Sequence, residues 1–302
     1  MDWINMIKAF EAYLILERSL SDKTIEAYRR DVHKLASFIE IHEMELSSRE
    51  VKLSHLQDFL IWINGLGLGA RSQARLISSI KAFYKFLLIE DLVEADPTEL
   101  LDAPKLARKI PEVLSFEEIQ LMFNAIDLST DHGTRNRAML ETLYASGLRV
   151  SELTDLKLSN LYFDLGFIKV IGKGNKERLV PIGDSAIKHI QFYLEGVRRP
   201  QMNIDKDSEN IVFLNRRGKK LSRIMVFNIV KDTAKAAGIE KNVSPHTFRH
   251  SFATHLIEGG ADLKAVQDML GHESILTTEI YTHLDTHFLR DTLLRFHPMN
   301  NR

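Results

Sequence analysis

Histidine is concentrated near the C-terminal end of this chain, where it is interleaved with arginine and hydroxyl residues. Seven of the twelve histidines lie in the last 57 of 302 residues, and the densest stretch is Pro-His246-Thr-Phe-Arg249-His250. On a helix, His246 and Arg249 stand three positions apart and share a face, so two hydrogen-bond donors can converge on one phosphoryl group. His246 and His250 stand four apart, which also suits two metal ligands. The spacing therefore indicates phosphoryl chemistry or a metal.

A metal site is the weaker of these interpretations. No glutamate follows His246, as a hydrolytic zinc helix requires, and Gly271-His272-Glu273 is followed by Leu276 where a second histidine would stand. The chain also contains no cysteine, which leaves hydroxyl, lysine, histidine and carboxylate side chains as candidate catalysts. Two glycine-rich strings, at residues 65–69 and 172–174, lack the spacing of phosphate-binding loops. With no aspartate cluster for magnesium, ATP use and two-metal nuclease chemistry are disfavoured.

Charge and composition describe a chain without a global attraction to nucleic acid. It has 40 basic and 41 acidic residues; residues 1–104 hold 12 and 17 of them, and the remainder 28 and 24. Any nucleic-acid surface must therefore be a local face.

The 44% of hydrophobic and 27% of charged residues are ordinary for a globular protein, and the length favours two domains. With no apolar run of about eighteen residues and no basic leader, we expect a cytoplasmic protein without a membrane segment.

The elements that must position the candidate residues lie on either side of a predicted linker at residues 104–110. Two prolines bracket three basic residues there, without apolar periodicity, so we predict domains at residues 1–103 and 111–302. Helical spacing at Asp22–Ile41 and Ala70–Asp91, with almost no strand signal, predicts a small helical bundle for the first domain.

The second domain is predicted to combine helices with one small antiparallel sheet. Ser115 and Glu118 form a capping box at a helix start, and Gly147 closes the next helix. Phe167–Ile171 and Arg178–Ile182 are β-rich runs joined by a loop rich in glycine, which predicts a hairpin. Helical patterns follow at Asp184–Arg198, Ser222–Ala237, Thr247–Glu258 and Leu263–Leu270. The expected fold class is therefore mainly α with a small antiparallel β-sheet.

A basic stripe follows one face of Ala70–Asp91. At about 100° per residue, four basic side chains fall within about 120° of one another. They are Arg71, Arg75, Lys81 and Lys85. The opposite face is apolar, so the helix can bury one side and present the other to a phosphate backbone; a solvated helix face explains the stripe equally well. Arg29 and Arg30, with Lys34, form a weaker second patch that solvent explains better.

Five strings occur in the order found in tyrosine recombinases, and the chain resembles that family along nearly its whole length. They are Ala145-Ser-Gly-Leu-Arg149-Val-Ser-Glu-Leu153, Gly172-Lys173-Gly-Asn-Lys-Glu-Arg178, His246-Thr-Phe-Arg249-His-Ser-Phe-Ala-Thr-His255, Leu270-Gly-His272 and Tyr281-Thr-His283. The segment from Pro245 to His283 resembles the bacterial Xer branch. The resemblance implies a helical N-terminal DNA-binding domain and a mixed catalytic domain that close around DNA as a C-shaped clamp.

The resemblance also implies catalytic roles for six residues. They are Arg149, Lys173, His246, Arg249, His272 and Tyr281. Tyr281 would be the nucleophile, His246 its proton acceptor, the two arginines the binders of the phosphate oxygens, and Lys173 the acid that protonates the departing 5′ oxygen. His272 would donate a hydrogen bond to the phosphate. His250 and His255 match no catalytic position of the family and are assigned to structure.

Three of these roles have an alternative in the residues themselves. Arg149 stands three positions before Glu152 and can simply pair with it. Lys173 can be an ordinary turn lysine, with Lys176 competing for its role. Tyr281 can belong to the core, because apolar residues flank it. These alternatives stay open at the level of sequence.

The activity implied by the resemblance is site-specific DNA strand exchange without metal or ATP, through a 3′-phosphotyrosyl intermediate and a Holliday junction. Four protomers would act on two duplex sites, as a homotetramer or as a heterotetramer with a related recombinase.

The apolar spacing in Thr286–Pro298 fits packing on its own domain or in a neighbour's groove. The implied task is resolving chromosome or plasmid dimers at cell division, with a DNA translocase of the division site as a partner. An integrase of a mobile element and a catalytically silent DNA-binding protein are the alternatives.

Overall fold

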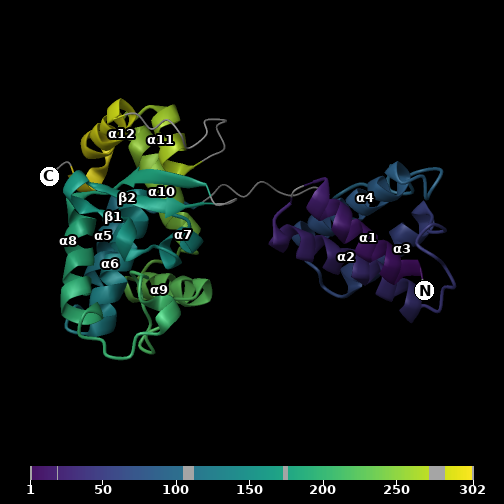
Figure 1. Ribbon diagram of the computed structural model, residues 1–302, viewed down its shortest axis with the longest axis horizontal. Helices are drawn as coiled ribbons and strands as arrows, with labels where there is room; N and C mark the ends of the chain where they lie inside the picture. Colours follow the sequence, from purple (N-terminus) through teal and green to yellow (C-terminus); the bar gives the residue numbers. More distant parts are fainter. Residues whose placement is uncertain (1, 19, 105–111, 173–175, 272–282, 301–302) are drawn as a thin grey trace. The chain divides into compact units, whose positions relative to one another are not determined.

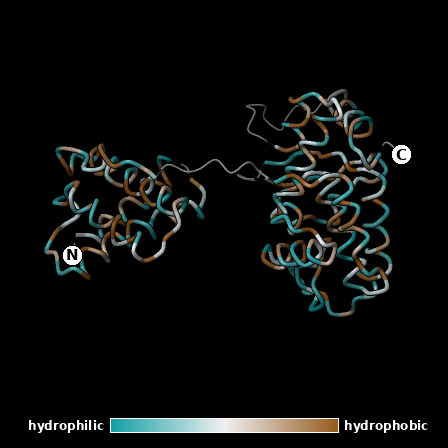
Figure 2. Tube along the Cα trace, turned by 180° about the vertical axis from the view of Figure 1, so that it is seen from behind, coloured by the Kyte–Doolittle hydropathy of each residue, from teal (hydrophilic) through white to brown (hydrophobic). Residues whose placement is uncertain are grey.

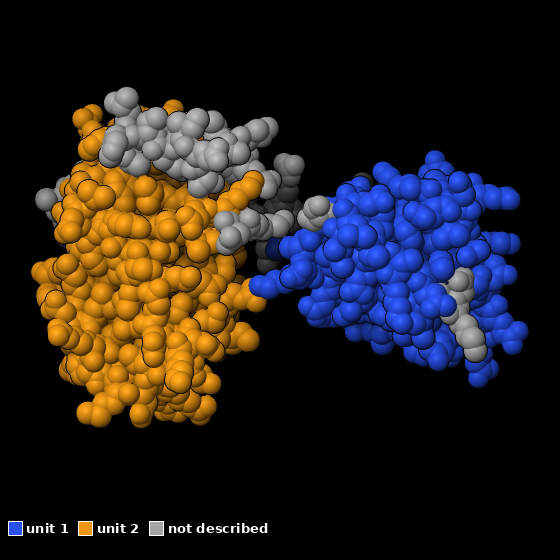
Figure 3. All heavy atoms as spheres, viewed as in Figure 1, with its two compact units in different colours: residues 1–109 blue, residues 110–302 orange. Residues whose placement is uncertain are grey.

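The computed structural model describes residues 2–18, 20–104, 112–172, 176–271 and 283–300. The chain divides into two compact units, residues 1–109 and 110–302 (Figure 3). Each unit has a hydrophobic core of its own. Along the helices of both units, hydrophobic and hydrophilic stretches alternate, as Figure 2 shows. Among the described residues, no helix is both long enough and apolar enough to span a membrane.

The first unit is a helical bundle. Its helices are α1 (Asp2–Leu16), α2 (Asp22–Ile41), α3 (Leu53–Gly65) and α4 (Ala70–Ile89) (Figure 1). The apolar face of α4 is fully inside the core, as its spacing predicts. The buried side chains are Leu76, Ile77, Ile80, Phe83, Tyr84 and Leu87. The hydrophobic effect therefore fixes which face of α4 remains outside.

The second unit combines helices with a three-stranded antiparallel sheet. Its helices are α5 (Phe116–Asn124), α6 (Asp131–Ser146), α7 (Val150–Thr154), α8 (Asp184–Tyr193) with a π-helical turn (Leu194–Arg198), α9 (Arg223–Ala236), α10 (Pro245–Glu258), α11 (Leu263–Leu270) and α12 (His283–Phe296). Short 3₁₀ turns are Leu158–Asn160, Phe163–Leu165, Lys206–Ser208 and Pro298–Asn300. The strands β1 (Leu161–Tyr162), β2 (Phe167–Ile171) and β3 (Glu177–Pro181) pair in that order, and Ile168 stands opposite Leu161 and Val180.

The predicted fold class is confirmed, and local signals explain most element boundaries. Ser115 accepts a hydrogen bond from the Glu118 amide at 3.2 Å and starts α5 as a capping box. β1 was not predicted, because two residues are too short to show a strand period. α10 begins at Pro245, two residues earlier than the periodicity indicates, since Ser244 caps it and a proline fits the first turn.

The C-terminal helix α12 packs on its own unit. Leu289 and Leu293 are buried in a cluster with residues of α10 and α11, among them Phe252 and Met269. Phe288 instead remains 55% exposed. Figure 1 shows α12 beside α11. Packing of α12 on its own domain is one of the two arrangements that the sequence left open.

Leu293→Ala is expected to lower the free energy of unfolding of the full chain by about 2–5 kcal/mol, because it leaves a cavity in this cluster. Urea titration followed by circular dichroism measures the loss. The matched control is Phe288→Ala on the exposed face of the same helix, for which we expect little change. Equal losses for the two variants would contradict the packing of α12 described above.

Candidate active site

Arg149 and Arg249 come together although a hundred residues separate them in the chain. Arg249 lies in α10 and is 9% exposed. It donates hydrogen bonds to the carbonyls of Gly147 and Leu270, both at 2.6 Å. Arg149 directly precedes α7 and donates to the Gly271 carbonyl at 3.1 Å. Two guanidinium groups thus reach the same short stretch at the end of α11.

A sharp turn between α6 and α7 gives Arg149 its position. Gly147 ends α6 in the left-handed conformation, with φ of 59°. A Cβ added there would lie 2.4 Å from the ring of Phe252, so a side chain would collide with α10 as well as strain the backbone. Glycine therefore allows the close approach that brings the start of α7 next to Arg249.

A buried carboxylate, Glu152, holds Arg149 in place. It accepts hydrogen bonds from the Arg149 guanidinium at 2.9 Å and from the Arg149 amide at 2.8 Å. The pairing weighed as an alternative role for Arg149 is therefore present. It occupies only part of the guanidinium, because the Arg149 side chain is still 38% exposed. The pair orients Arg149 without sealing it from a substrate.

Arg178 is a site residue to which sequence reasoning assigned no role. It lies in β3 and contacts both oxygens of Glu152, at 2.7 and 2.9 Å. Its partner stands 26 positions away, so no helical spacing could reveal the pair. Its place at the end of the recognised Gly172–Arg178 string was the one available signal. We call Arg149, Glu152, Arg178 and Arg249 the arginine cluster.

The end of α11 is capped by the three arginines of this cluster. Consecutive carbonyls accept from different guanidinium groups: Met269 from Arg178 at 3.1 Å, then Leu270 from Arg249 and Gly271 from Arg149. The last carbonyls of a helix lack partners within it and carry partial negative charge. The helix end therefore holds the guanidinium groups in register, directly before the position of His272 in the sequence.

The cluster carries an excess of positive charge. Burial, and next the charge of Arg149, lower the pKa of Arg249 to about 10, so its guanidinium stays protonated at neutral pH. Burial alone would raise the pKa of the Glu152 carboxyl. The hydrogen bonds and the positive charge of Arg178, followed by the hydrogen bonds from Arg149, outweigh burial, so the pKa of Glu152 is lowered overall. The cluster thus has three cations and one carboxylate, which contacts two of them, Arg149 and Arg178. An anion bound at the cluster would reduce the electrostatic repulsion between the guanidinium groups, which the fold holds close together.

His246 and His255 have different surroundings, although both lie in α10. His246 is exposed in the first turn, one turn before Arg249. It is therefore accessible to solvent on the same helix as Arg249. His255 is buried and shares a hydrogen bond of 2.8 Å with the Tyr144 hydroxyl. This environment agrees with its assignment to structure.

Three of the six predicted catalytic residues lie outside the described residues: Lys173, His272 and Tyr281. Lys176, the competing candidate, is described and exposed. Its carbonyl accepts a hydrogen bond from the Gly172 amide at 2.7 Å, which joins the residue after β2 to the residue before β3.

The basic residues of the first unit differ in how far carboxylates engage them. Arg71 and Lys85 are exposed on α4, and Lys81 is half-buried. Arg75 forms an ion pair with the buried Asp31 of α2. The spacing along α4 places Arg75 on the basic face, but its partner Asp31 lies on another helix and leaves no signal in that spacing.

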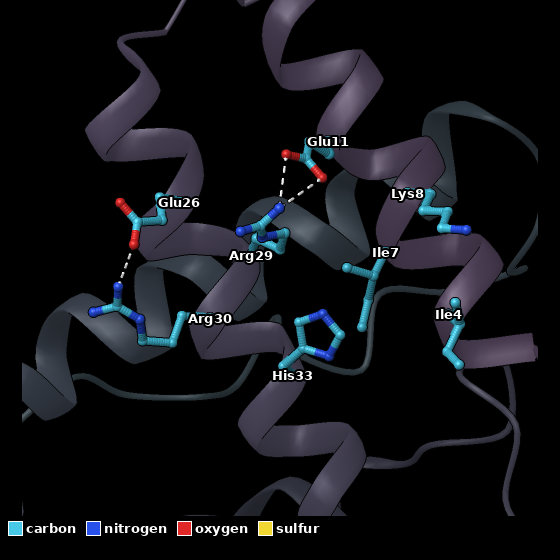
Figure 4. A pocket seen from close by; sticks show the side chains of 8 residues that line it. All are labelled: Ile4, Ile7, Lys8, Glu11, Glu26, Arg29, Arg30 and His33. Atoms are coloured by element: carbon cyan, nitrogen blue, oxygen red, sulfur yellow. Dashed lines mark hydrogen bonds and ion pairs between the residues drawn. The ribbon is translucent and has the colours of Figure 1, made fainter.

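Arg29 and Arg30, the weaker patch, both face carboxylates. Arg29 pairs with Glu11 across α1 and α2 at 3.2 Å, and Arg30 pairs with Glu26 one turn away. Both pairs line a pocket of about 470 Å³ between these helices (Figure 4). Both arginines therefore have a carboxylate partner, although their side chains remain 45% and 63% exposed.

Family models account for both units of the chain. The phage integrase family model matches residues 112–287, and the model of the phage integrase N-terminal SAM-like domain matches residues 7–91. The chain belongs to the phage integrase family. Its arginine cluster and His246 thus lie in the part that matches the integrase model. It is a tyrosine recombinase, an enzyme that cuts and rejoins DNA strands at specific sites.

Relatives and solved structures agree with this assignment. The tyrosine recombinase is 46% identical over 299 residues to tyrosine recombinase XerD of Chlorobaculum tepidum, covering 98% of this chain and 97% of the relative. Tyrosine recombinase XerD of Listeria monocytogenes serovar 1/2a is 42% identical, over 97% and 99% of the two chains. The XerH recombinase in a pre-cleavage complex with its difH substrate matches with a TM-score of 0.65 and 26% identity, over 88% and 78%. A lambda integrase dimer on a core site, 18% identical with a TM-score of 0.68 over 91% and 96%, shares the fold.

Proposed function

We propose that this chain is a Xer-type recombinase that resolves chromosome or plasmid dimers at cell division, and that Tyr281 joins covalently to the DNA. The observation that carries the proposal is the convergence of Arg149 and Arg249 at the end of α11. Two planar guanidinium groups can bind the non-bridging oxygens of one phosphate and stabilise its extra charge in the transition state. The high identity to recombinases named XerD supports the Xer assignment.

The reaction proposed for these residues needs no energy source. The Tyr281 hydroxyl attacks phosphorus, its proton passes to His246, and the bond between phosphorus and the 5′ oxygen breaks. Lys173 protonates that oxygen, while His272 donates a hydrogen bond to the phosphate. A phenol has a pKa of about 10, so the tyrosine needs both an acceptor and a cationic field to attack at neutral pH. The 3′-phosphotyrosyl bond retains the energy of the phosphodiester, and a 5′ hydroxyl of the other duplex reverses the step.

Strand exchange between two duplexes determines the number of protomers in the proposed assembly. Four protomers would bind two sites and exchange one pair of strands at a time through a Holliday junction. The four are copies of this chain or include a related recombinase, and a DNA translocase of the division site is the proposed further partner in the cytoplasm. Both units would contact the duplex, the second at the scissile phosphate and the first through α4.

Removing exposed positive charges from α4 is expected to lower the affinity for DNA and to make that affinity less dependent on salt concentration. Arg71→Ala and Lys85→Ala should each reduce the slope of log affinity against log salt by about 1, since each removes one phosphate contact. Lys206→Ala, an exposed lysine of the other unit, is the control and should leave the slope unchanged. Fluorescence anisotropy at several salt concentrations measures the slope. Unchanged slopes for both α4 variants would assign the stripe to solvent.

Capture of covalent complexes tests the proposed function and finds the site. The protein is incubated with fragmented DNA of its own genome, without nucleotide and with a chelator, and denatured complexes are sequenced. We expect enrichment of one short, roughly palindromic chromosomal or plasmid site. Enrichment at the ends of a mobile element would instead assign an integrase, and DNA binding without any adduct would assign a silent DNA-binding protein.

A further inference from the structure

Arg178 is enclosed by the protein rather than open to a substrate. Its side chain is 7% exposed. The Nε atom donates to the Met269 carbonyl at 3.1 Å, and the two terminal nitrogens donate to the two oxygens of Glu152. A Cβ at Gly271 would lie 3.0 Å from the Arg178 guanidinium carbon, so the backbone covers the group there. Its role must therefore act through other residues.

Glu152 divides its negative charge unequally between its two arginines. The pair with Arg178 is bidentate and buried on both sides, with side-chain exposures of 7% and 2%. The pair with Arg149 has one hydrogen bond between side chains, and Arg149 is 38% exposed. Because Coulomb attraction grows as water is excluded, the buried fork of Arg178 neutralises more of the carboxylate than Arg149 does.

We propose that Arg178 is a positioning residue for strand cleavage: it neutralises Glu152 and thereby leaves the positive charge of Arg149 free for the scissile phosphate. The inference rests on the proposed function. Without Arg178, the buried carboxylate has Arg149 as its remaining side-chain partner within the arginine cluster, and Arg149 then compensates Glu152 instead of the substrate. Met269 also loses a donor, so the end of α11 is held by two arginines instead of three.

The experiment compares two DNA substrates that differ in charge. Both are nicked duplexes with the site recovered from covalent complexes; one has an ordinary scissile phosphate and the other a methylphosphonate, which lacks one negative charge. Arg178→Met should cleave the ordinary phosphate about 10–100-fold more slowly than wild type. Its rate on the methylphosphonate should stay within about threefold of wild type, because less charge needs compensation. A smaller folded fraction of Arg178→Met would lower its rate on both substrates by the same factor. The ratio of the rate loss on the ordinary phosphate to the rate loss on the methylphosphonate is therefore independent of how much of the protein is folded.

A second variant restores the charge balance by another route. Glu152→Gln combined with Arg178→Met removes both buried charges, while the glutamine oxygen can still accept from Arg149. The double variant should cleave the ordinary phosphate at least about tenfold faster than Arg178→Met alone, as expected for coupled neighbours. Arg199→Met, at an exposed arginine outside the cluster, is the control and should match wild type on both substrates.

Each outcome decides the inference. Equal losses of Arg178→Met on the two substrates, or a double variant no faster than the single one, would overturn it and leave Arg178 a structural role. Wild-type protein that cleaves neither substrate would overturn the proposed function itself. Wild-type cleavage together with full activity of Arg178→Met overturns the inference alone.

Discussion

Tyr281→Phe is expected to bind the recombination site with unchanged affinity and to form no covalent complex. The substitution removes only the hydroxyl that attacks phosphorus, and loss of a nucleophile lowers the rate by about 10⁴-fold or more. A nicked duplex, from which the cleaved fragment diffuses away, traps the adduct on a denaturing gel. Anisotropy measurements on the intact duplex give the affinity.

The matched control for this variant is Tyr162→Phe. Tyr162 lies in β1, is 39% exposed and belongs to the same unit. It should form adduct at the wild-type rate. Adduct formation by Tyr281→Phe, or its loss in Tyr162→Phe, would show that the nucleophile is assigned to the wrong tyrosine.

Arg249→Lys is the second variant with a large expected effect, a loss of about 10²–10³ in cleavage rate with nearly normal DNA affinity. The Arg249 guanidinium donates to the carbonyls of Gly147 and Leu270 through its two terminal nitrogens. Each of these nitrogens has a second N–H group, and we expect these groups to donate to the phosphate oxygens. A lysine keeps the charge but has a single ammonium group, which cannot satisfy two carbonyls and a phosphate with that geometry. DNA binding depends on many contacts and should change little.

Single-turnover cleavage of the nicked duplex measures this loss, and Arg199→Lys at an exposed position provides the control. Thermal unfolding of both variants shows whether each substitution leaves the fold intact. Cleavage by Arg249→Lys at the control rate would mean that this side chain does not clamp the phosphate, whatever its hydrogen bonds in the free protein.

The helices could be predicted from sequence because local physics determines them. Asp22–Ile41 matches α2 residue for residue, since its apolar spacing and flanking polar residues depend on no distant contact. Gly147 ends α6 as predicted, because few residues other than glycine adopt its positive φ. β1 escaped prediction because its two residues form a strand only through pairing with β2.

The candidate site was predicted from sequence only in part. Arg149, His246 and Arg249 were found through motif resemblance, and the structure brings the two arginines together. The Glu152 carboxylate and Arg178 could not be paired from sequence, because a buried ion pair depends on which strands and helices meet in space. The same limit applies to Arg75, whose partner Asp31 lies on a different helix.

Covalent catalysis by Tyr281 is tested by identifying the amino acid that becomes joined to DNA and the DNA end that it holds. Wild-type protein is trapped on the nicked duplex, digested with nuclease and protease, and analysed by mass spectrometry. We predict one modified peptide, with a 3′-phosphorylated nucleotide on Tyr281, and a released strand with a free 5′ hydroxyl. A link to any other residue, or to a 5′ phosphate, would contradict it.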